Sequence, residues 1–274
     1  MKKGIPFSAL VSILLFARCN SSIDTDLLPP NIPIQISMEV TEDRVFTRAP
    51  VSIINSGNIS SVGIYGITES NTSGVFPWVA SPLLSNLSPA TYNSGQVNFS
   101  PAVYYPDGGK RLMFYGYYPK TTDTSGNNYI TAPGNGVAPV YNFTLTGQED
   151  IMYATSTPFG SNTPGTPTLA FNHKLTQIIL DTSILGLLKS IKLKDVKNKG
   201  AMDLGTGVIS YSNSIIDIPL TISNNKTATV MVPADIDKYK IEVTLLILPL
   251  TYYIRPTSGN FLPGKIYTIQ LPLL

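Results

Sequence analysis

Apolar and polar residues alternate along short stretches of this chain, which is the pattern of half-buried β-strands. The clearest case is residues 34–40, Ile-Gln-Ile-Ser-Met-Glu-Val, where every second side chain is apolar. Further strand candidates are residues 62–67, 97–103, 111–118, 141–145, 169–180, 190–196, 215–222, 227–232, 240–248 and 265–271. Clusters of Gly, Pro and Asn separate them, and only residues 184–188 indicate a helical turn. The pattern predicts an all-β protein built of antiparallel sandwiches.

A turn-rich stretch near the middle of the chain marks the expected domain boundary. Residues 155–168 contain three prolines and two glycines and show no apolar period. We therefore expect one β-sandwich domain in residues 49–160 and a second in residues 161–274.

The start of the chain has the organisation of an export signal. Two lysines precede an apolar run at residues 5–17, and Cys19, the only cysteine, follows it. The run is shorter than the roughly 20 residues that a transmembrane helix needs. We expect residues 1–18 to be a signal peptide and Cys19 to receive a lipid that anchors a propeptide, residues 19–48. Arg18 stands where a small residue is usual, so cleavage without a lipid and an incidental cysteine are the alternatives.

Composition refines this picture. Apolar residues make up 43% of the chain and include fifteen tyrosines, which is enough to bury a core. The net charge of +2 gives no electrostatic case for binding nucleic acid. A chain with one cysteine cannot form an internal disulfide, so its stability must come from the sheet cores.

Candidate chemistry is weak. His173 is the only histidine, so a zinc site built from several histidines is excluded, and packing at a strand end is the better interpretation. The chain has no Gly-x-Ser-x-Gly motif of a serine hydrolase. We therefore expect no catalytic residue, no metal site and no cofactor.

Two surface features have a structural and a functional interpretation. Lys192 and Lys194 alternate with apolar residues and are expected on the solvent face of a strand, where they discourage edge-to-edge aggregation; anionic glycan binding is the alternative. The tyrosine pairs at residues 104–105 and 117–118 are expected to pack across strands, with sugar stacking as the alternative.

Four motifs follow one another in a family-specific order. They are Leu-Met-Phe-Tyr-Gly-Tyr-Tyr-Pro at residues 112–119, Asp-Ile-Met-Tyr-Ala at 150–154, Leu-Ala-Phe-Asn-His-Lys-Leu at 169–175 and Leu-Pro-Gly-Lys-Ile-Tyr-Thr-Ile at 262–269. Together they resemble the fimbrillin family, the type V pilins and related lipoproteins of anaerobic gut and oral bacteria. The resemblance implies two tandem transthyretin-like sandwich domains and export as an outer-membrane lipoprotein. It also implies removal of the N-terminal strand by an Arg-specific protease and polymerisation with other pilin subunits by donor-strand exchange.

The bond between Arg48 and Ala49 is the expected cleavage site. Arg48 lies eight residues after the strand at 34–40. Loss of that strand would leave a groove of unpaired backbone groups that another subunit's strand could fill. Only two arginines follow it, Arg111 and Arg255, which suits a chain that meets such a protease. The alternative is that Arg48 is an ordinary exposed loop residue.

We expect a non-enzymatic fimbrial subunit that mediates adhesion at the cell surface. The chain stops directly after the strand at 265–271, and pulling that strand out would uncover a core. A tip or accessory role is therefore expected, and a role as strand donor is the alternative. A different class also stays open: a monomeric, lipid-anchored module that binds a glycan or a host protein and never polymerises.

Overall fold

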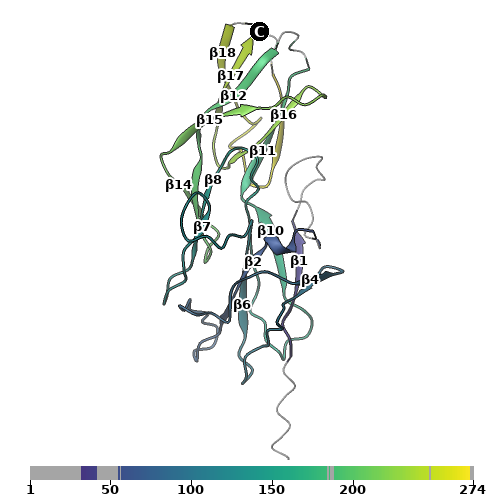
Figure 1. The fold of residues 1–274 in the computed structure, drawn as a ribbon, viewed down its shortest axis with the longest axis vertical. Coiled ribbons are helices and arrows are strands. Elements are labelled where there is room, and N and C mark those ends of the chain that lie inside the picture. Colours follow the sequence, from purple (N-terminus) through teal and green to yellow (C-terminus); the bar gives the residue numbers. More distant parts are fainter. Residues whose placement is uncertain are drawn as a thin grey trace, which may run out of the picture. The chain divides into compact units, whose positions relative to one another are not determined.

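The structure is a computed structural model that describes residues 32–41, 55, 57–183, 185, 188–246 and 248–271. Within these residues the chain forms nineteen β-strands and one short 3-10 helix, η1 (Ile59–Ser61) (Figure 1). No helix in this described part has the length and apolar character needed to cross a bilayer. The prediction of an all-β protein is confirmed, whereas the finer prediction of two transthyretin-like domains stays a prediction.

Eight strands form the first sheet, in the order β3-β2-β6-β9-β10-β1-β5-β4. They are β1 (Gln35–Val40), β2 (Gly63–Thr68), β3 (Leu84–Leu87), β4 (Thr91–Asn93), β5 (Gln96–Asn98), β6 (Leu112–Tyr118), β9 (Met152–Thr155) and β10 (Thr168–His173). The second sheet has the order β14-β13-β8-β7. Its strands are β7 (Tyr129–Ile130), β8 (Val140–Thr144), β13 (Lys199–Asp203) and β14 (Ile209–Tyr211).

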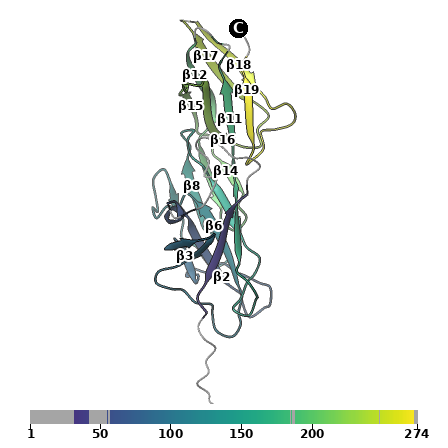
Figure 2. The same cartoon turned by 90° about the vertical axis from the view of Figure 1, so that its right-hand side faces the viewer.

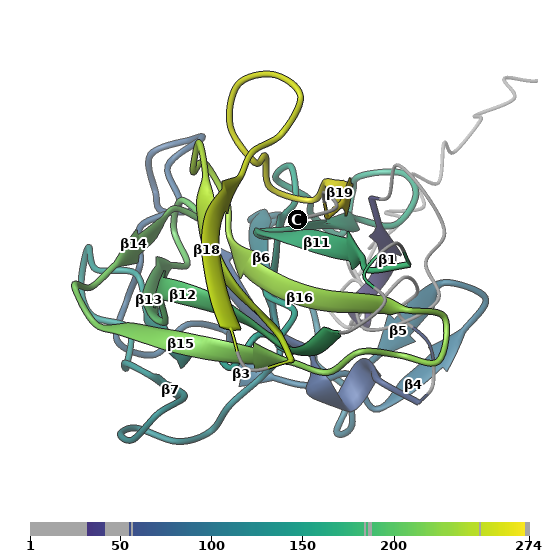
Figure 3. The ribbon, with the colours of Figure 1, turned by 90° about the horizontal axis from the view of Figure 1, so that it is seen from above.

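Two further sheets face each other as a sandwich (Figure 3). The third sheet, β16-β11-β19, contains β11 (Leu175–Asp181), β16 (Thr227–Pro233) and β19 (Ile266–Gln270). The fourth sheet, β15-β12-β17-β18, contains β12 (Leu188–Lys197), β15 (Ile215–Leu220), β17 (Tyr239–Leu245) and β18 (Leu248–Ile254).

Three groups of buried side chains form the cores of the protein. The N-terminal core lies on one face of the first sheet and includes Ile36, Ile64, Val97, Phe114, Leu169 and Phe171. The middle core lies between the first and second sheets and includes Tyr65, Tyr117, Tyr141, Phe143, Tyr153 and Met202. The C-terminal core lies between the third and fourth sheets and includes Ile178, Leu193, Ile218, Val230, Ile241 and Phe261.

The central strands of the first sheet bury both faces. In β6, Phe114 contributes to the N-terminal core, whereas Tyr115 and Tyr117 contribute to the middle core. A strand covered on both sides needs no polar face, which explains why residues 112–118 read as a nearly continuous apolar and aromatic run.

Most predicted strands are present, but several of their limits are wrong. The strand predicted at 97–103 ends at Asn98, since Pro101 lacks the N–H that a ladder needs. The run at 169–180 is two strands, β10 and β11, which belong to different sheets. The run at 240–248 contains a turn between β17 and β18, and Leu188, at the end of the predicted helical turn, begins β12.

Strand pairing does not follow the predicted domain boundary at residue 160. Strand β10 follows that boundary in sequence but pairs with β9 and β1, and β13 pairs with β8. The division into residues 49–160 and 161–274 therefore stays a prediction about the chain and is not a boundary between sheets.

The two lysines of β12 lie on the solvent face, as predicted, but not at a sheet edge. Strand β12 is paired on both sides, by β15 and β17. Lys192 Nζ lies 3.7 Å from Glu242 Oε1, and Lys194 forms an ion pair with Asp217. The prediction that these lysines guard an edge is wrong, because β12 lies inside the sheet and their charges are met by neighbouring carboxylates.

Gly116 offers a test of the packing between β6 and β10. A methyl group added to Gly116 would lie 2.6 Å from Phe171 Cζ, inside the N-terminal core. Gly116→Ala should therefore lower the free energy of unfolding by about 1–3 kcal/mol, the usual effect of overpacking. The measurement is equilibrium urea unfolding. Gly134→Ala is the control, because its added methyl meets only Val137 at 3.5 Å and should change stability by less than about 0.5 kcal/mol.

Candidate assembly site

The first strand of the described chain lies in the interior of a sheet. Strand β1 pairs in parallel with β10, from Ser37 opposite Thr168 to Val40 opposite Phe171. On its other side it pairs antiparallel with β5. In Figure 2, β1 is the purple strand. Removal of β1 would therefore divide the sheet between β10 and β5.

The backbone of β1 is held from both sides by hydrogen bonds. The Ile34 and Met38 N–H groups donate to the carbonyls of Val103 (2.7 Å) and Gly95 (2.9 Å). Toward β10, the N–H groups of Ser37 and Thr41 donate to the carbonyls of Pro167 and Phe171, each at 2.8 Å. Without β1, these carbonyls would have to find water or another strand, because unpaired buried backbone groups are costly.

The side chains of β1, and of Ile34 just before it, alternate as the sequence predicts. Ile34, Ile36 and Met38 are 1%, 0% and 4% exposed and belong to the N-terminal core, whereas Gln35 and Glu39 face solvent. Beside them, on the same face of the sheet, lie the buried apolar side chains of Val97 from β5 and of Leu169 and Phe171 from β10. The place that β1 occupies is thus an apolar groove edged by backbone hydrogen-bonding groups, the kind of site that binds an extended strand.

The other residues predicted for this site lie outside the described residues. These are Cys19, the predicted lipidation site, and the predicted cleavage site at Arg48 and Ala49. Thr41 is the last described residue after β1, and the described chain resumes at Asn55. Lipidation and cleavage both stay predictions.

The sequence did not show which strands pair with β1. Strand β10 begins at Thr168, far along the chain, and β5 is a strand of three residues. The sequence signal that did succeed is the period-2 alternation of residues 34–40, which identifies the strand and its buried face.

His173 lies at the end of β10 and is buried, as predicted. Its Nδ1 atom is 2.8 Å from Asp150 Oδ1, a hydrogen bond between two buried side chains that the sequence did not reveal. Together with Thr41 and Lys265, His173 lines a cavity of about 360 Å³. Among the residues that the structure describes, no group of three or more His, Cys, Asp or Glu side chains could hold a metal ion.

The tyrosine pairs mostly pack inside the protein. Tyr117 is fully buried, its hydroxyl donates to Asn86 Oδ1 at 2.8 Å, and burial raises its pKa to about 12. Tyr105 is 8% exposed, and burial raises its pKa to about 12 as well. Tyr104, in contrast, is 43% exposed. The prediction of packing is confirmed for Tyr105 and Tyr117, whereas Tyr118 is half-buried and Tyr104 is exposed.

A comparison with known protein families identifies the family of this chain. Residues 47–273 match the profile of the family described as fimbrillin-like, so the chain belongs to the fimbrillin-like family. A comparison with curated proteins finds no match.

Solved structures share this fold. A fimbrial protein from Bacteroides vulgatus ATCC 8482 is 15% identical with a TM-score of 0.50, covering 86% of this chain and 95% of its own. A candidate cell adhesion protein from Bacteroides ovatus ATCC 8483 is 18% identical with a TM-score of 0.55, covering 88% and 92%. Another, from Bacteroides uniformis ATCC 8492, is 16% identical with a TM-score of 0.53, covering 88% and 93%. At these identities the likeness shows a common fold.

The contribution of β1 to stability can be measured at Ile36. Its side chain is 0% exposed in the N-terminal core, so Ile36→Ala should lower the free energy of unfolding by about 2–5 kcal/mol. Gln35→Ala, one residue away on the solvent face, should change it by less than about 0.5 kcal/mol. Urea unfolding of both variants provides the comparison. Equal, small effects would show that β1 does not close the core in solution.

Proposed function

We propose that this protein is a subunit or accessory protein of a surface fimbrium, that it acts in adhesion, and that it is not an enzyme. Membership of the fimbrillin-like family supports this, and so do solved structures of the same fold that are described as fimbrial and cell adhesion proteins. No cofactor enters the proposal. Its partners are other fimbrial subunits and, through adhesion, a host protein or glycan.

The observation that carries the proposal is the place of β1 in the sheet. An N-terminal strand inserted between β10 and β5 can be removed by a single cut in the segment that follows it, and Arg48 lies in that segment. Cleavage between Arg48 and Ala49 would release β1 and open the groove. Burial of each large apolar side chain is worth about 1.5–3 kcal/mol, so an open groove would strongly favour a replacement strand.

A replacement strand must meet simple chemical requirements. It needs apolar side chains at every second position, to take the places of Ile34, Ile36 and Met38, and free backbone groups along both of its edges. A strand from another subunit meets these requirements, which is assembly by donor-strand exchange.

The same cut would also free the subunit from the membrane. If Cys19 carries a lipid, the anchor and β1 lie on the same side of Arg48 in sequence. One cleavage would then detach the protein from the outer membrane and open its groove together, so that only released subunits are ready to assemble.

We further propose that this subunit accepts a donor strand more readily than it offers β19. Strand β19 pairs with β11 over five residue pairs, and Tyr267 and Ile269 pack against the C-terminal core. Withdrawing β19 would uncover that core, which is a large loss compared with the gain from filling another subunit's groove. This fits a tip or accessory position in the fimbrium.

The first test is Arg48→Ala. Because Arg44 lies in the same segment, the variant is made in an Arg44→Ala background, and it should then keep β1 in its groove and stay monomeric after treatment with an Arg-specific protease. The wild-type protein should lose residues up to Arg48 and form SDS-resistant oligomers with a partner subunit, visible as a ladder on a gel. Arg44→Ala is the matched control and should behave as wild type. Wild-type protein that is cut but remains monomeric beside partner subunits would favour the lipid-anchored binding module instead.

The second test concerns the anchor. Radiolabelled palmitate should enter the wild-type precursor at Cys19, and Cys19→Ala should abolish the label and move the protein to the soluble fraction, since attachment through acyl chains would be lost. Equal labelling of the variant and the wild type would contradict lipidation at this residue.

A further inference from the structure

Arginine is distributed unevenly along this chain. Twelve lysines but only two arginines, Arg111 and Arg255, follow Arg48. Both of these arginines lie in the described part of the chain, whereas Arg18, Arg44 and Arg48 lie outside it. The question is whether the fold leaves either of the two open to a protease that cuts after arginine.

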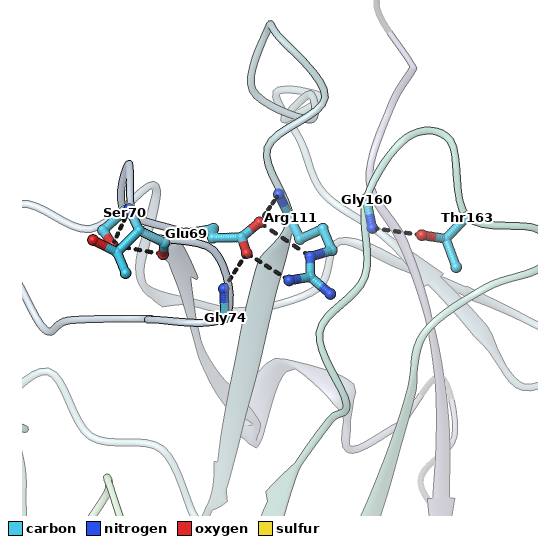
Figure 4. A network of polar contacts seen from close by, with 7 residues as sticks. Glu69, Ser70, Gly74, Arg111, Gly160 and Thr163 are labelled. Carbon is cyan, nitrogen blue, oxygen red and sulfur yellow. Dashed lines mark hydrogen bonds and ion pairs between the residues drawn. The ribbon is translucent and has the colours of Figure 1, made fainter.

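The side chain of Arg111 is held by Glu69. Arg111 Nε donates to Glu69 Oε2 at 3.0 Å and Nη2 donates to Glu69 Oε1 at 2.5 Å, a two-point contact between guanidinium and carboxylate. The guanidinium carbon also lies 5.9 Å from the centre of the Phe76 ring. Figure 4 shows this contact, with the carboxylate lying between Arg111 and Gly74.

The carboxylate of Glu69 is itself fixed in place. The Gly74 N–H donates to Glu69 Oε1 at 2.6 Å, and the Glu69 side chain is only 10% exposed. The bond from Arg111, followed by the bond from Gly74, lowers the pKa of Glu69 to about 2. Glu69 is therefore ionised at any pH at which the protein would meet a protease, and the contact with Arg111 is present throughout that range.

The backbone around the Arg111–Leu112 bond is also occupied. The Glu69 N–H donates to the Arg111 carbonyl at 2.8 Å. Leu112 and Phe159 exchange two backbone hydrogen bonds, at 2.7 and 2.8 Å, and the loop after Phe159 is closed by a bond from the Gly160 N–H to Thr163 Oγ1 at 3.1 Å (Figure 4). Leu112 thus begins β6, and Arg111, just before the strand, has its carbonyl paired with Glu69.

An arginine-specific protease must bind two groups, the arginine side chain and the backbone around the bond, and at Arg111 both already have partners within the protein. It binds the arginine side chain in an acidic pocket and holds the backbone around the cut bond in its active site. At Arg111 the guanidinium already contacts a carboxylate and the backbone is already paired. Cleavage there must wait for local opening of the sheet, and its rate then depends on how often that opening occurs.

The bond after Arg255 is protected from cleavage in a different way, by the proline that follows it. The side chain of Arg255 is 60% exposed and lies 3.9 Å from Asp237 Oδ2, so the fold hides little of it. The next residue, however, is Pro256, whose ring is attached to the nitrogen of the bond that would be cut. This ring occupies the space in which a protease holds the leaving amine. At Arg48 the proline is one residue further on, after Ala49, and leaves the bond itself unobstructed.

We propose that both arginines after Arg48 are closed to arginine-specific cleavage, Arg111 by its contact with Glu69 and the paired backbone, and Arg255 by Pro256. An arginine-specific protease can then cut only before β2, although lysines remain common after Arg48. The biological use of this arrangement rests on the proposed maturation at Arg48. The resistance itself does not depend on it.

The experiment is digestion of the full chain with an arginine-specific endoprotease, with fragments identified by intact-mass spectrometry. The folded wild-type protein should show no cut after Arg111 or Arg255. Heat-unfolded wild type should be cut after Arg111 but still not after Arg255, which separates protection by the fold from protection by proline. Wild-type protein cut after Arg111 equally fast when folded and unfolded would overturn the proposal.

Variants test separately the protection of Arg111 by Glu69 and the protection of Arg255 by Pro256. Glu69→Ala should speed the cut after Arg111 at least tenfold, and Pro256→Ala should speed the cut after Arg255 at least tenfold in folded protein. Ser70→Ala is the matched control, because Ser70 bonds to Thr72 and not to Arg111, and it should leave Arg111 resistant. If Glu69→Ala does not fold by circular dichroism, Glu69→Gln supplies the readout, with a smaller increase expected.

Two results would contradict the proposal: a folded Glu69 variant as resistant at Arg111 as the wild type, or a Pro256 variant that stays uncut. Cuts within residues 42–54 are scored in the same digest. Their absence would count against the proposed maturation while leaving the resistance of Arg111 and Arg255 standing.

Discussion

The N-terminal core depends on the pairing of one strand with two neighbours that lie far from it in sequence. Strand β1 supplies backbone hydrogen bonds to both β10 and β5 and contributes Ile34, Ile36 and Met38 to the core beneath. An edge strand could leave and expose one side of a ladder, but the loss of an interior strand leaves two unpaired edges and an uncovered apolar core. The contacts of β1 that stabilise the first sheet are therefore the same contacts that a donor strand would have to replace in the proposed assembly.

The run from β10 to β11 links the N-terminal and C-terminal cores. These two strands are separated only by Lys174, yet the first belongs to the eight-stranded sheet and the second to the third sheet. Each has a parallel neighbour, β1 for β10 and β19 for β11 (Figure 2). The strands near the two ends of the described chain thus both pair with one continuous run of sequence.

The local sequence pattern predicted those features that depend only on neighbouring residues, such as where a strand lies and which of its faces is buried. The alternation of residues 34–40 gave the strand and its buried face, and the lone His173 was placed correctly at a strand end. The pattern did not predict which strands pair, because the contact of β1 with β10 is set by packing across more than a hundred residues. Nor did it find Asp150 as the partner of His173 or Glu69 as the partner of Arg111, since both pairs join residues distant in sequence. Short strands such as β4 and β7 have too few residues for an alternating pattern to show.

Because β1 belongs to the same polypeptide as its groove, it competes with any incoming strand as an intramolecular ligand. A short tether gives such a ligand an effective concentration in the millimolar range, far above that of a free subunit in solution. In the proposed assembly, a second subunit's strand is therefore at a disadvantage as long as the chain is intact. In the same proposal, a cut tether would make β1 a ligand diluted by the surrounding volume, so that subunit concentration and strand affinity would decide which strand occupies the groove.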